Sequence, residues 1–325
     1  MKRTFSLLLA ILLTLCLCAS CAMADETALP DTVRVTTLMG PTGMGMAKLI
    51  HDTNEGTAAL PYSFTIASAP DQVSADVITG NFDIAAVPVN LASVLYNKTQ
   101  GQIKVAGVNT LGVLYILENG DTVASVEDLK GKTLYATGQG SNPEYVLRYI
   151  LEKNGIDPDN DLTVEYVAEH AELATKMVSG DAVLGMLPEP NVTSVLLGNG
   201  DVRIALNLTE EWDKVSETRL VQGCIIVRSA FAEEYPQVLA AFLDEYAASV
   251  AFVNENIDEA AAMIEAAGII PKAAVAKKAL SNCNICLLTG EEMKAAVSDM
   301  LGVLFEAKPA SIGGTMPDEA FYYLP

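Results

Sequence analysis

The chain has 325 residues, of which 50% are hydrophobic, and it carries 41 acidic residues against 20 basic ones. This length is enough for one large or two medium-sized domains with complete cores. The formal net charge of −21 argues against nucleic acid and against an anionic membrane surface as partners. An anionic small ligand is not excluded, because local dipoles rather than total charge govern a pocket.

Residues Met1 to about Ala24 have the pattern of a secretion signal. Lys2 and Arg3 precede an apolar run from Phe5 to Leu17, and small residues follow. Two cleavage sites compete. The segment ending at Cys21 resembles a bacterial lipobox, with Cys18 in place of the usual Leu, whereas residues 22–24 fit an ordinary A-x-A site. We favour a lipoprotein anchored at Cys21, and with either site the mature protein works outside the cytoplasmic membrane, in the periplasm or at the cell surface.

Later apolar runs, such as Gly112–Leu117 and Leu220–Val227, are too short to span a bilayer and predict buried strands. Three cysteines, Cys224, Cys283 and Cys286, lie beyond the signal. The CxxC spacing of Cys283 and Cys286 invites a redox or zinc interpretation, but a second CxxC, a nearby His and a thioredoxin-like Trp or Pro are missing. We expect buried or loosely paired cysteines, and the sequence leaves a disulfide open.

The first half of the mature chain alternates strands with helices, which predicts an α/β architecture. The apolar segment Asp83–Pro88 is the kind of strand expected in a parallel sheet covered on both faces. In chain order we expect a strand at Val33–Leu38, a Gly-rich turn at Met39–Met46, a helix to about His51, a strand at Tyr62–Ala67, a helix at Pro70–Thr79, the strand ending at Pro88, and a helix at Leu91–Tyr96.

The same order then begins again. Gly80–Pro88 and Gly180–Pro188 have the same spacing, so the sequence predicts two lobes related by a weak internal duplication. The expected elements of the second lobe are a strand at Leu134–Thr137, a Gly-rich turn, a helix at Tyr145–Asn154, a strand at Leu162–Val167, a helix at Ala171–Val178, and a strand at Ala182–Pro188.

Two apolar segments connect the lobes in this interpretation, Val105–Leu117 and Arg219–Val227. We therefore expect residues 33–117 with 220–325 to form lobe 1, and residues 118–219 to form lobe 2. The rest of lobe 1 is predicted to be helical, with apolar faces at helical spacing. The expected helices are Pro236–Asn254, Ile257–Ala267, Lys272–Leu280 and Glu291–Glu306.

The Gly-rich turn before Tyr145 has the pattern of a helix start. Asn142 is a good N-cap, Pro143 fits the first turn, and Glu144 complements the helix dipole. Because the first N–H groups of a helix lack partners, this turn can receive an anionic or strongly polar ligand group. The turn Gly40–Met44 would face it from the other lobe.

From Val33 to about Ala307 the chain resembles the solute-binding proteins of ABC importers, in the branch for nitrate, alkanesulfonates, taurine and thiamine-pyrimidine precursors. The resemblance rests on four short segments in a fixed order, which are Leu129-Lys130-Gly131-Lys132, Gly138-x-Gly140-Ser141, Gly155-Ile156, and Val178-Ser179-Gly180-Asp181 before Leu187-Pro188-Glu189-Pro190. It implies a type II periplasmic-binding-protein-like fold, with two α/β lobes joined by two crossing hinge strands and a solute held between them.

Ligands of open α/β sheets bind beyond the carboxyl ends of the strands, and domain closure is coupled to binding. Side-chain contacts are expected from Thr42, Asn90, Ser141 and Glu189, although the first three could be only helix caps. Glu189 favours a ligand with a hydrogen-bond donor such as an amine, and Arg219 could instead serve an anionic head group. The full expected set is Gly40, Thr42, Gly43, Asn90, Asn109, Thr110, Gly138, Gly140, Ser141, Glu189 and Gln222. His51 and His170 are interpreted as surface or helix-end residues.

The main hypothesis is a monomeric extracytoplasmic receptor that hands a small polar or anionic organic solute to an ABC permease, without a cofactor or a metal. Two alternatives stay open. One is a binding module for a membrane sensor. The other is an enzyme like those relatives that make the thiamine pyrimidine from pyridoxal phosphate and a sacrificed histidine, against which the sparse cysteines and the export signal argue. A Ser-His-acid set or a paired-carboxylate site is not evident in the sequence. The sequence does not identify the solute.

Overall fold

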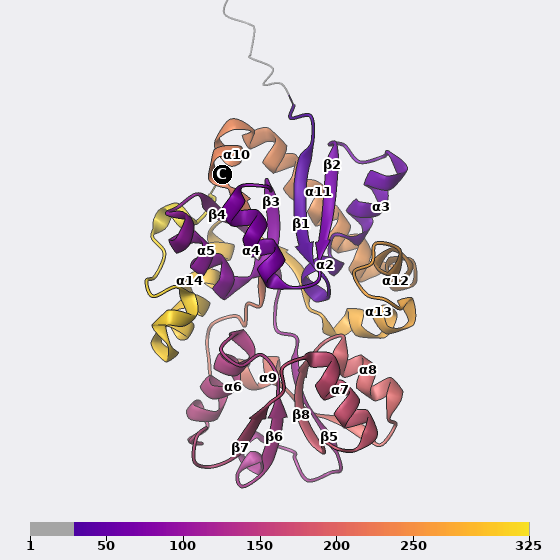
Figure 1. Cartoon of the computed structure of the whole chain (residues 1–325), viewed down its shortest axis with the longest axis vertical. Coiled ribbons are helices and arrows are strands. Elements are labelled where there is room, and N and C mark those ends of the chain that lie inside the picture. The colour runs from indigo at the N-terminus through magenta and orange to yellow at the C-terminus, as the bar shows by residue number, and fades with distance from the viewer. Residues whose placement is uncertain (1–28, 325) are drawn as a thin grey trace, which may run out of the picture. The chain divides into compact units, whose positions relative to one another are not determined.

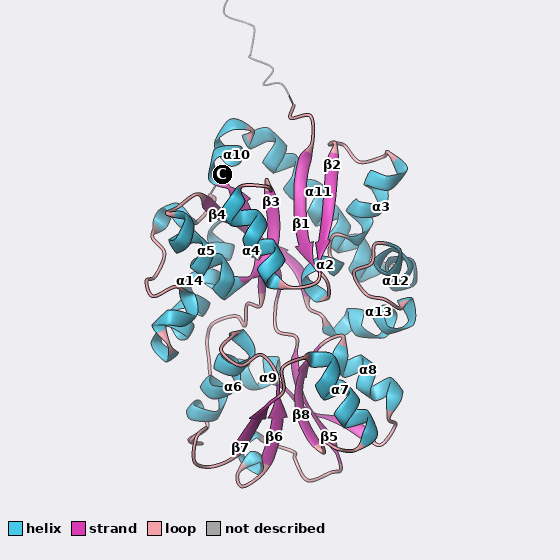
Figure 2. Ribbon diagram, in the orientation of Figure 1, coloured by secondary structure: helices cyan, strands magenta, loops and turns pink. Residues whose placement is uncertain are grey.

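The described strands gather into two separate sheets, each flanked by helices (Figure 1; Figure 2). The computed structural model describes residues 29–324, so the expected signal peptide and Cys21 lie outside the described residues. The part from Thr32 onward forms one unit. We call the region built on the first sheet lobe 1 and the region built on the second sheet lobe 2.

Lobe 1 contains a six-stranded mixed sheet in the order β11-β4-β10-β3-β1-β2. The strand β1 is parallel to β2 and β3, whereas β10 runs antiparallel to both β3 and β4. Because Gly223 pairs with Pro88, β10 starts at the edge where β3 ends. The strands are β1 (Val33–Leu38), β2 (Tyr62–Ala67), β3 (Ile84–Pro88), β4 (Ile103–Thr110), β10 (Gly223–Arg228) and β11 (Ile285–Leu288).

Lobe 2 repeats this plan with five strands in the order β7-β6-β8-β5-β9. Strands β6, β7 and β8 are parallel, and β5 is antiparallel to β8 and β9. The strands are β5 (Leu114–Asn119), β6 (Thr133–Ala136), β7 (Thr163–Tyr166), β8 (Leu184–Pro188) and β9 (Val202–Asn207). The bounds of β3 and β8 differ by 100 residues, as the repeated spacing predicts. The mixed α/β fold with two sheets is confirmed.

Helices cover both faces of each sheet, which explains the apolar character of the inner strands. Along β3, Ile84 and Ala86 join one core cluster, whereas Ala85 and Val87 join another. The described helices are α2 (Pro41–Met44), α3 (Ala47–Glu55), α4 (Pro70–Thr79), α5 (Val89–Thr99), α6 (Asn142–Lys153), α7 (His170–Ser179), α8 (Asn191–Gly198), α9 (Leu208–Asp213), α10 (Ser229–Glu234), α11 (Pro236–Glu255), α12 (Ile257–Ala266), α13 (Ala273–Ala279) and α14 (Gly290–Ala307), with short 3-10 turns η1 (Val126–Leu129), η2 (Leu280–Asn282), η3 (Pro309–Ile312) and η4 (Glu319–Phe321).

The boundary between the lobes differs from the sequence prediction. Strand β5 pairs with β8 and β9, so residues 114–117 belong to the second sheet rather than to lobe 1. The first connection is therefore Leu111–Val113. The return strand starts at Gly223 rather than at Arg219. The end of β4 and the segment before β10 are hydrogen-bonded to each other, since the Gln222 N–H donates to the Thr110 carbonyl at 3.0 Å.

Two strands, β9 and β11, have no counterpart in the sequence prediction. Strand β11 lies in a stretch predicted to be almost all helical, and it is only four residues long and half-buried after Ile285. Strand β9 alternates too weakly to be recognised, because Arg203 and Asn207 are both only half-buried. Both strands lie at sheet edges. None of the described helices is long and apolar enough to cross a membrane.

Candidate functional site

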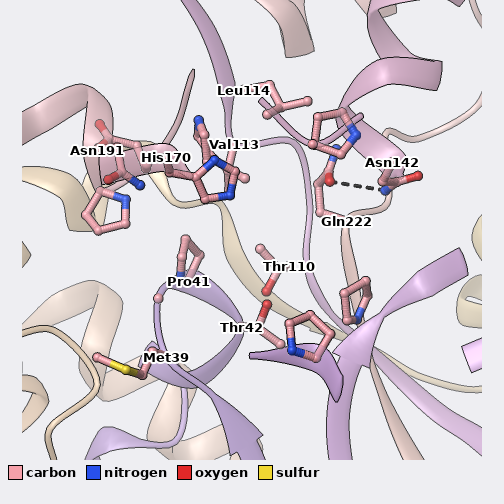
Figure 3. A pocket seen from close by; sticks show the side chains of 18 of the residues that line it. Met39, Pro41, Thr42, Thr110, Val113, Leu114, Asn142, His170, Asn191 and Gln222 are labelled. Atoms are coloured by element: carbon pink, nitrogen blue, oxygen red, sulfur yellow. Dashed lines mark hydrogen bonds between the residues drawn. The ribbon is translucent and has the colours of Figure 1, made fainter. Parts of the chain in front are cut away.

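A cavity of about 550 Å³ lies where the strands of both sheets end (Figure 3). Its lining combines seven prolines with aliphatic side chains and small polar groups. The lining residues are Met39, Gly40, Pro41, Thr42, Ser68, Pro70, Pro88, Asn90, Leu91, Thr110, Val113, Leu114, Gly138, Ser141, Asn142, Pro143, His170, Pro188, Glu189, Pro190, Asn191, Gln222, Ile269, Ile270 and Pro271. The volume is within the range of small-molecule sites.

Four helices of ten or more residues, α4, α5, α6 and α7, begin at this cavity without a side-chain hydrogen bond that caps their first turn. Their first residues or caps, including Pro70, Pro88, Ser141 and His170, are among the lining residues. The first N–H groups of a helix carry a partial positive charge equivalent to about half an elementary charge. The cavity therefore collects positive potential from backbone dipoles.

Eight of the expected site residues line the cavity, namely Gly40, Thr42, Asn90, Thr110, Gly138, Ser141, Glu189 and Gln222. The other three have structural partners instead. A Cβ on Gly43 would lie 2.2 Å from the Leu38 carbonyl oxygen, so this glycine permits a close approach inside the chain. Asn109 is buried and donates from Nδ2 to the Thr42 carbonyl at 3.0 Å. Gly140 does not line the cavity, and its N–H donates to Glu144 within the same turn.

The turn that opens α6 differs from the sequence prediction in two details. Ser141 rather than Asn142 is the N-cap residue, and its hydroxyl donates to the Gly138 carbonyl at 2.7 Å. The Gly140 N–H donates to the Glu144 carboxylate at 2.6 Å. This donor is therefore already used inside the chain, and Glu144 places a negative charge beside the turn.

The matching turn of lobe 1, which opens at Gly40, is hydrogen-bonded to segments outside the turn. Gly40 has φ +84°, a conformation that favours glycine, and its N–H donates to the Ile269 carbonyl at 3.2 Å. The Thr42 carbonyl accepts from Asn109, which leaves the Thr42 side chain facing the cavity. In Figure 3 the hydroxyls of Thr42 and Thr110 turn toward each other.

Glu189 is 1% exposed although it lines the cavity. Its carboxylate accepts from the Thr193 N–H at 3.1 Å, from the Thr193 hydroxyl at 3.0 Å, and from Asn282 Nδ2 at 3.2 Å. Burial raises the pKa of the Glu189 carboxyl, and these three hydrogen bonds offset the rise only in part. Because the carboxylate caps α8 and contacts lobe 1, its interactions in this structure are internal rather than directed at the cavity.

His170 lines the cavity, although the sequence suggests only a helix-end residue. It is the first residue of α7, and its ring reaches into the cavity (Figure 3). The ring nitrogen Nδ1 lies 2.7 Å from the Thr137 hydroxyl. Burial lowers the pKa of His170 below its ordinary value, which favours the neutral ring. The sequence does contain a signal for this role, because His170 begins a helix that follows a strand, and such positions lie at the cavity end of the sheet.

Asn142 and Gln222 form a pair of amides at the edge of the cavity. Asn142 Nδ2 donates to Gln222 Oε1 at 3.1 Å, drawn as a dashed line in Figure 3, and to the Val221 carbonyl at 3.4 Å. Two carbonyl partners fix the orientation of the Asn142 amide, because turning it over would bring oxygen against oxygen. Asn142 Oδ1 and Gln222 Nε2 are buried and have no hydrogen-bond partner.

Arg219 and the three cysteines, which the sequence suggested as possible functional residues, do not line the cavity. Arg219 forms an exposed ion pair with Glu292 at 2.7 Å and does not line the cavity. Lys and Arg are absent from the cavity lining of the described chain. Cys224 and Cys283 are buried, Cys286 is half-buried, and all three are free thiols. Residues Ile269–Pro271, in the loop after α12, contribute an apolar wall that the sequence pattern did not mark.

The comparisons with known proteins agree with this geometry. The model of the family described as "ABC transporter, phosphonate, periplasmic substrate-binding protein" matches residues 58–275. A crystal structure of an ABC transporter protein from Parabacteroides distasonis is 25% identical, covers 90% of this chain and 99% of its own, and has a TM-score of 0.77. The sequence has no significant match among curated proteins.

Two more distant structures share the fold. The periplasmic aliphatic sulphonate binding protein SsuA from Escherichia coli is 17% identical, with 91% of this chain and 93% of its own covered and a TM-score of 0.70. The periplasmic nitrate-binding protein NrtA from Synechocystis PCC 6803 is 12% identical, with 86% and 83% covered and a TM-score of 0.61. The family match spans more than half of the chain. The chain therefore belongs to the phosphonate-type family of periplasmic substrate-binding proteins of ABC transporters, and it is the extracytoplasmic component that binds a small solute for delivery to the permease.

Proposed function

We propose that the solute is a small organic monoanion with an apolar body, such as a short sulfonate or carboxylate. The observation that carries this proposal is the set of four helix starts without a side-chain cap around a cavity that holds no Lys or Arg in the described chain. Backbone dipoles of this kind favour one negative charge. Leu91, Ile269 and Ile270 would contact the apolar body.

A dianion such as a fully ionised phosphonate fits this cavity less well. Burying two negative charges requires opposite charges or many hydrogen bonds, and the lining supplies no cationic side chain. The Glu189 carboxylate, which has the same sign as the solute, adds repulsion at short range. Two proteins that share the fold, one described as a sulphonate-binding protein and one as a nitrate-binding protein, are also named for monoanions.

Within this proposal, Thr42, Asn90, Gln222 and His170 supply side-chain donors to the head group. The hydroxyls of Ser141 and Thr110 already donate inside the chain, to the Gly138 carbonyl and to Asn109 Oδ1. Gly40 and Gly138 allow the chain to approach it closely. Glu189 positions α8 rather than contacting an amine on the solute. The protein works by binding alone, as a monomer, with Cys21 as the lipid anchor. The mass of the mature protein, purified from membranes, tests the anchor, since lipidation at Cys21 removes residues 1–20 and adds acyl chains.

Thermal denaturation with a matched solute series tests the proposed class. The protein is first unfolded and refolded to remove any copurified solute, and then titrated with ethanesulfonate, ethylphosphonate at pH 8, and the neutral ethanesulfonamide. Stabilisation grows with the ratio of ligand concentration to Kd. We expect ethanesulfonate to raise Tm the most and the sulfonamide the least. Equal stabilisation by the sulfonamide, or none by any monoanion, contradicts the proposal.

Variants refine this test at the side-chain level. Thr42→Val removes one hydroxyl from the cavity and is expected to weaken ethanesulfonate binding about fivefold, which corresponds to about 1 kcal/mol for one hydrogen bond. Ser141→Ala should weaken binding less, because the Ser141 hydroxyl already donates to the Gly138 carbonyl. Ser179→Ala, at the other end of α7 and outside the cavity, is the matched control and should leave Kd unchanged.

A further inference from the structure

The segment around Asn282 reaches from lobe 1 to lobe 2 beside the cavity. Asn282 ends the turn η2 and precedes β11, the edge strand of the first sheet. Its partners come from the second sheet. Tyr115 lies on β5, and Glu189 directly follows β8. These two strands pair with each other, so the two partners sit on a common rigid support.

Lobe 2 holds Asn282 at two points. The Tyr115 hydroxyl donates to the Asn282 backbone carbonyl at 3.1 Å, and Asn282 Nδ2 donates to Glu189 Oε1 at 3.2 Å. Tyr115 is 4% exposed and Glu189 is 1% exposed, whereas Asn282 is half-buried, so both contacts are partly shielded from bulk water. A hydrogen bond to a charged group in such surroundings is stronger than one on the surface.

The Glu189 carboxylate is stabilised only by uncharged hydrogen-bond donors. Within residues 29–324, none of the ion pairs involves Glu189, and two of its three hydrogen bonds come from Thr193 in the same lobe. Asn282 supplies the third donor from the other lobe. When the lobes separate, this donor leaves and water must replace it. The contact is therefore specific to the arrangement in which the lobes close on the cavity.

We propose that Asn282, gripped by Tyr115 and Glu189, is a positioning residue that latches the two lobes together and thereby slows solute release. It acts on the lobes and not on the solute, because Asn282 and Tyr115 do not line the cavity. The role in retention rests on the proposed function as a solute receptor. Closure coupled to binding makes such a contact part of the affinity, since only interactions that differ between the open and closed states shift their populations.

Four variants test the latch. Asn282→Ala removes the side-chain donor, and Tyr115→Phe removes the hydroxyl. The double variant Asn282→Asp with Glu189→Gln exchanges the roles, because the new Gln amide can donate to the new carboxylate, whereas Asn282→Asp alone places two carboxylates in contact. Arg219→Ala is the control, since its partner Glu292 lies on α14 and their ion pair is exposed. Circular dichroism checks that each variant is folded.

The first readout is small-angle X-ray scattering of the solute-free protein, and the second is the release rate of ethanesulfonate by stopped flow. We expect Asn282→Ala to increase the radius of gyration and to speed release about tenfold, as the loss of one buried charge-assisted hydrogen bond predicts. Tyr115→Phe should have a smaller effect in the same direction. The double variant should restore both values relative to Asn282→Asp alone, and Arg219→Ala should change neither.

Unchanged scattering together with an unchanged release rate in Asn282→Ala overturns the latch, and so does a double variant no better than Asn282→Asp. If ethanesulfonate does not bind the wild-type protein, the proposed solute class fails by itself. In that case the scattering of the solute-free variants still decides the latch, because it does not depend on a bound solute.

Discussion

Buried carboxylates have different hydrogen-bond donors at the two ends of the sheets. At the cavity end, Glu189 accepts hydrogen bonds only from uncharged donors. At the outer ends, Asp83 in lobe 1 and Glu118 in lobe 2 each meet arginine. Asp83 lies 2.9 Å from both Arg34 and Arg228, and Arg203 is the cross-strand partner of Glu118.

The pKa shifts follow this difference. Burial alone would raise the pKa of Asp83, but hydrogen bonds from Arg34 and Arg228 outweigh it and the pKa is lowered. Burial likewise opposes the lowered pKa of Glu118, which results from hydrogen bonds with Thr122 and Val123 and from the Arg203 charge. For Glu189 burial prevails, and the pKa is raised.

Asp83 and Glu118 therefore stabilise a single lobe each, whereas the surroundings of Glu189 depend on how the two lobes are arranged. Asp83 ties together β1, β3 and β10, whose outer ends carry Arg34, Asp83 and Arg228, so its interactions stay within one sheet. Glu118 ties β5 to β9 and to the loop after β5. Glu189, by contrast, depends for one donor on the other lobe, so its environment changes when the lobes move.

Removing an outer carboxylate should have the largest effect on stability. Asp83→Asn or Glu118→Gln keeps the size of the side chain but leaves arginines without their partner. Breaking a buried ion pair costs about 3–5 kcal/mol. We expect a value near the lower limit, about 3 kcal/mol, because Arg34 and Arg203 reach solvent, with side-chain exposures of 43% and 38%.

Urea unfolding measures this loss, with Glu189→Gln as the contrasting variant. Because Glu189 has no cationic partner and burial disfavours its charge, we expect Glu189→Gln to change the free energy of unfolding by less than about 1 kcal/mol. An equal loss in all three variants would contradict the distinction between the two ends.

Much of the fold is predictable from the sequence because the signals are local. The apolar runs that end at Pro88 and Pro188, each preceded by a Gly helix stop, predict β3 and β8 with their covered faces. Edge strands such as β9 and β11 escape prediction, since a half-buried edge has weak alternation and its pairing depends on distant residues. The predicted lobe boundary differs from the observed one for the same reason, because only the pairing of β5 with β8 shows that β5 belongs to the second sheet.

The site is predictable only in part. Turns after strands predict which backbone segments reach the cavity, which accounts for Gly40, Thr42, Asn90 and Ser141. The directions of side chains are not local. One of the three hydrogen-bond donors to Glu189 comes from Asn282, 93 residues away in sequence, and the ring of His170 enters the cavity through its position at the start of α7.

The pH dependence of stability should divide the carboxylates in the same way. The lowered pKa values of Asp83 and Glu118 contribute stability that is complete above their ordinary values of 3.8 and 4.5 and is lost as pH falls through the lowered values. The raised pKa of Glu189 has the opposite sign. Its penalty is present above the raised value and disappears as pH falls toward 4.5.

Chemical unfolding between pH 3 and pH 7 tests this prediction. Asp83→Asn and Glu118→Gln should each flatten the loss of stability on the acid side, because the variant no longer takes up that proton. Glu189→Gln should leave the acid-side loss in place and remove a gain that the wild-type protein shows as pH falls toward 4.5. A steeper acid-side loss in Asp83→Asn would contradict the assigned sign.

The smallest effect is expected at the exposed ion pair between Arg219 and Glu292. Both side chains are more than half exposed, at 53% and 56%, although their 2.7 Å distance is shorter than the 2.9 Å of the two Asp83 pairs. Surface pairs contribute about 0–1 kcal/mol, because water screens the charges and the side chains lose freedom. We expect Arg219→Ala to change the free energy of unfolding by less than about 0.5 kcal/mol. Since the pair joins the second connection to α14, a loss comparable to that of Asp83→Asn would show that this connection carries as much charge-dependent stability as the outer ends of the sheets, which contradicts the comparison.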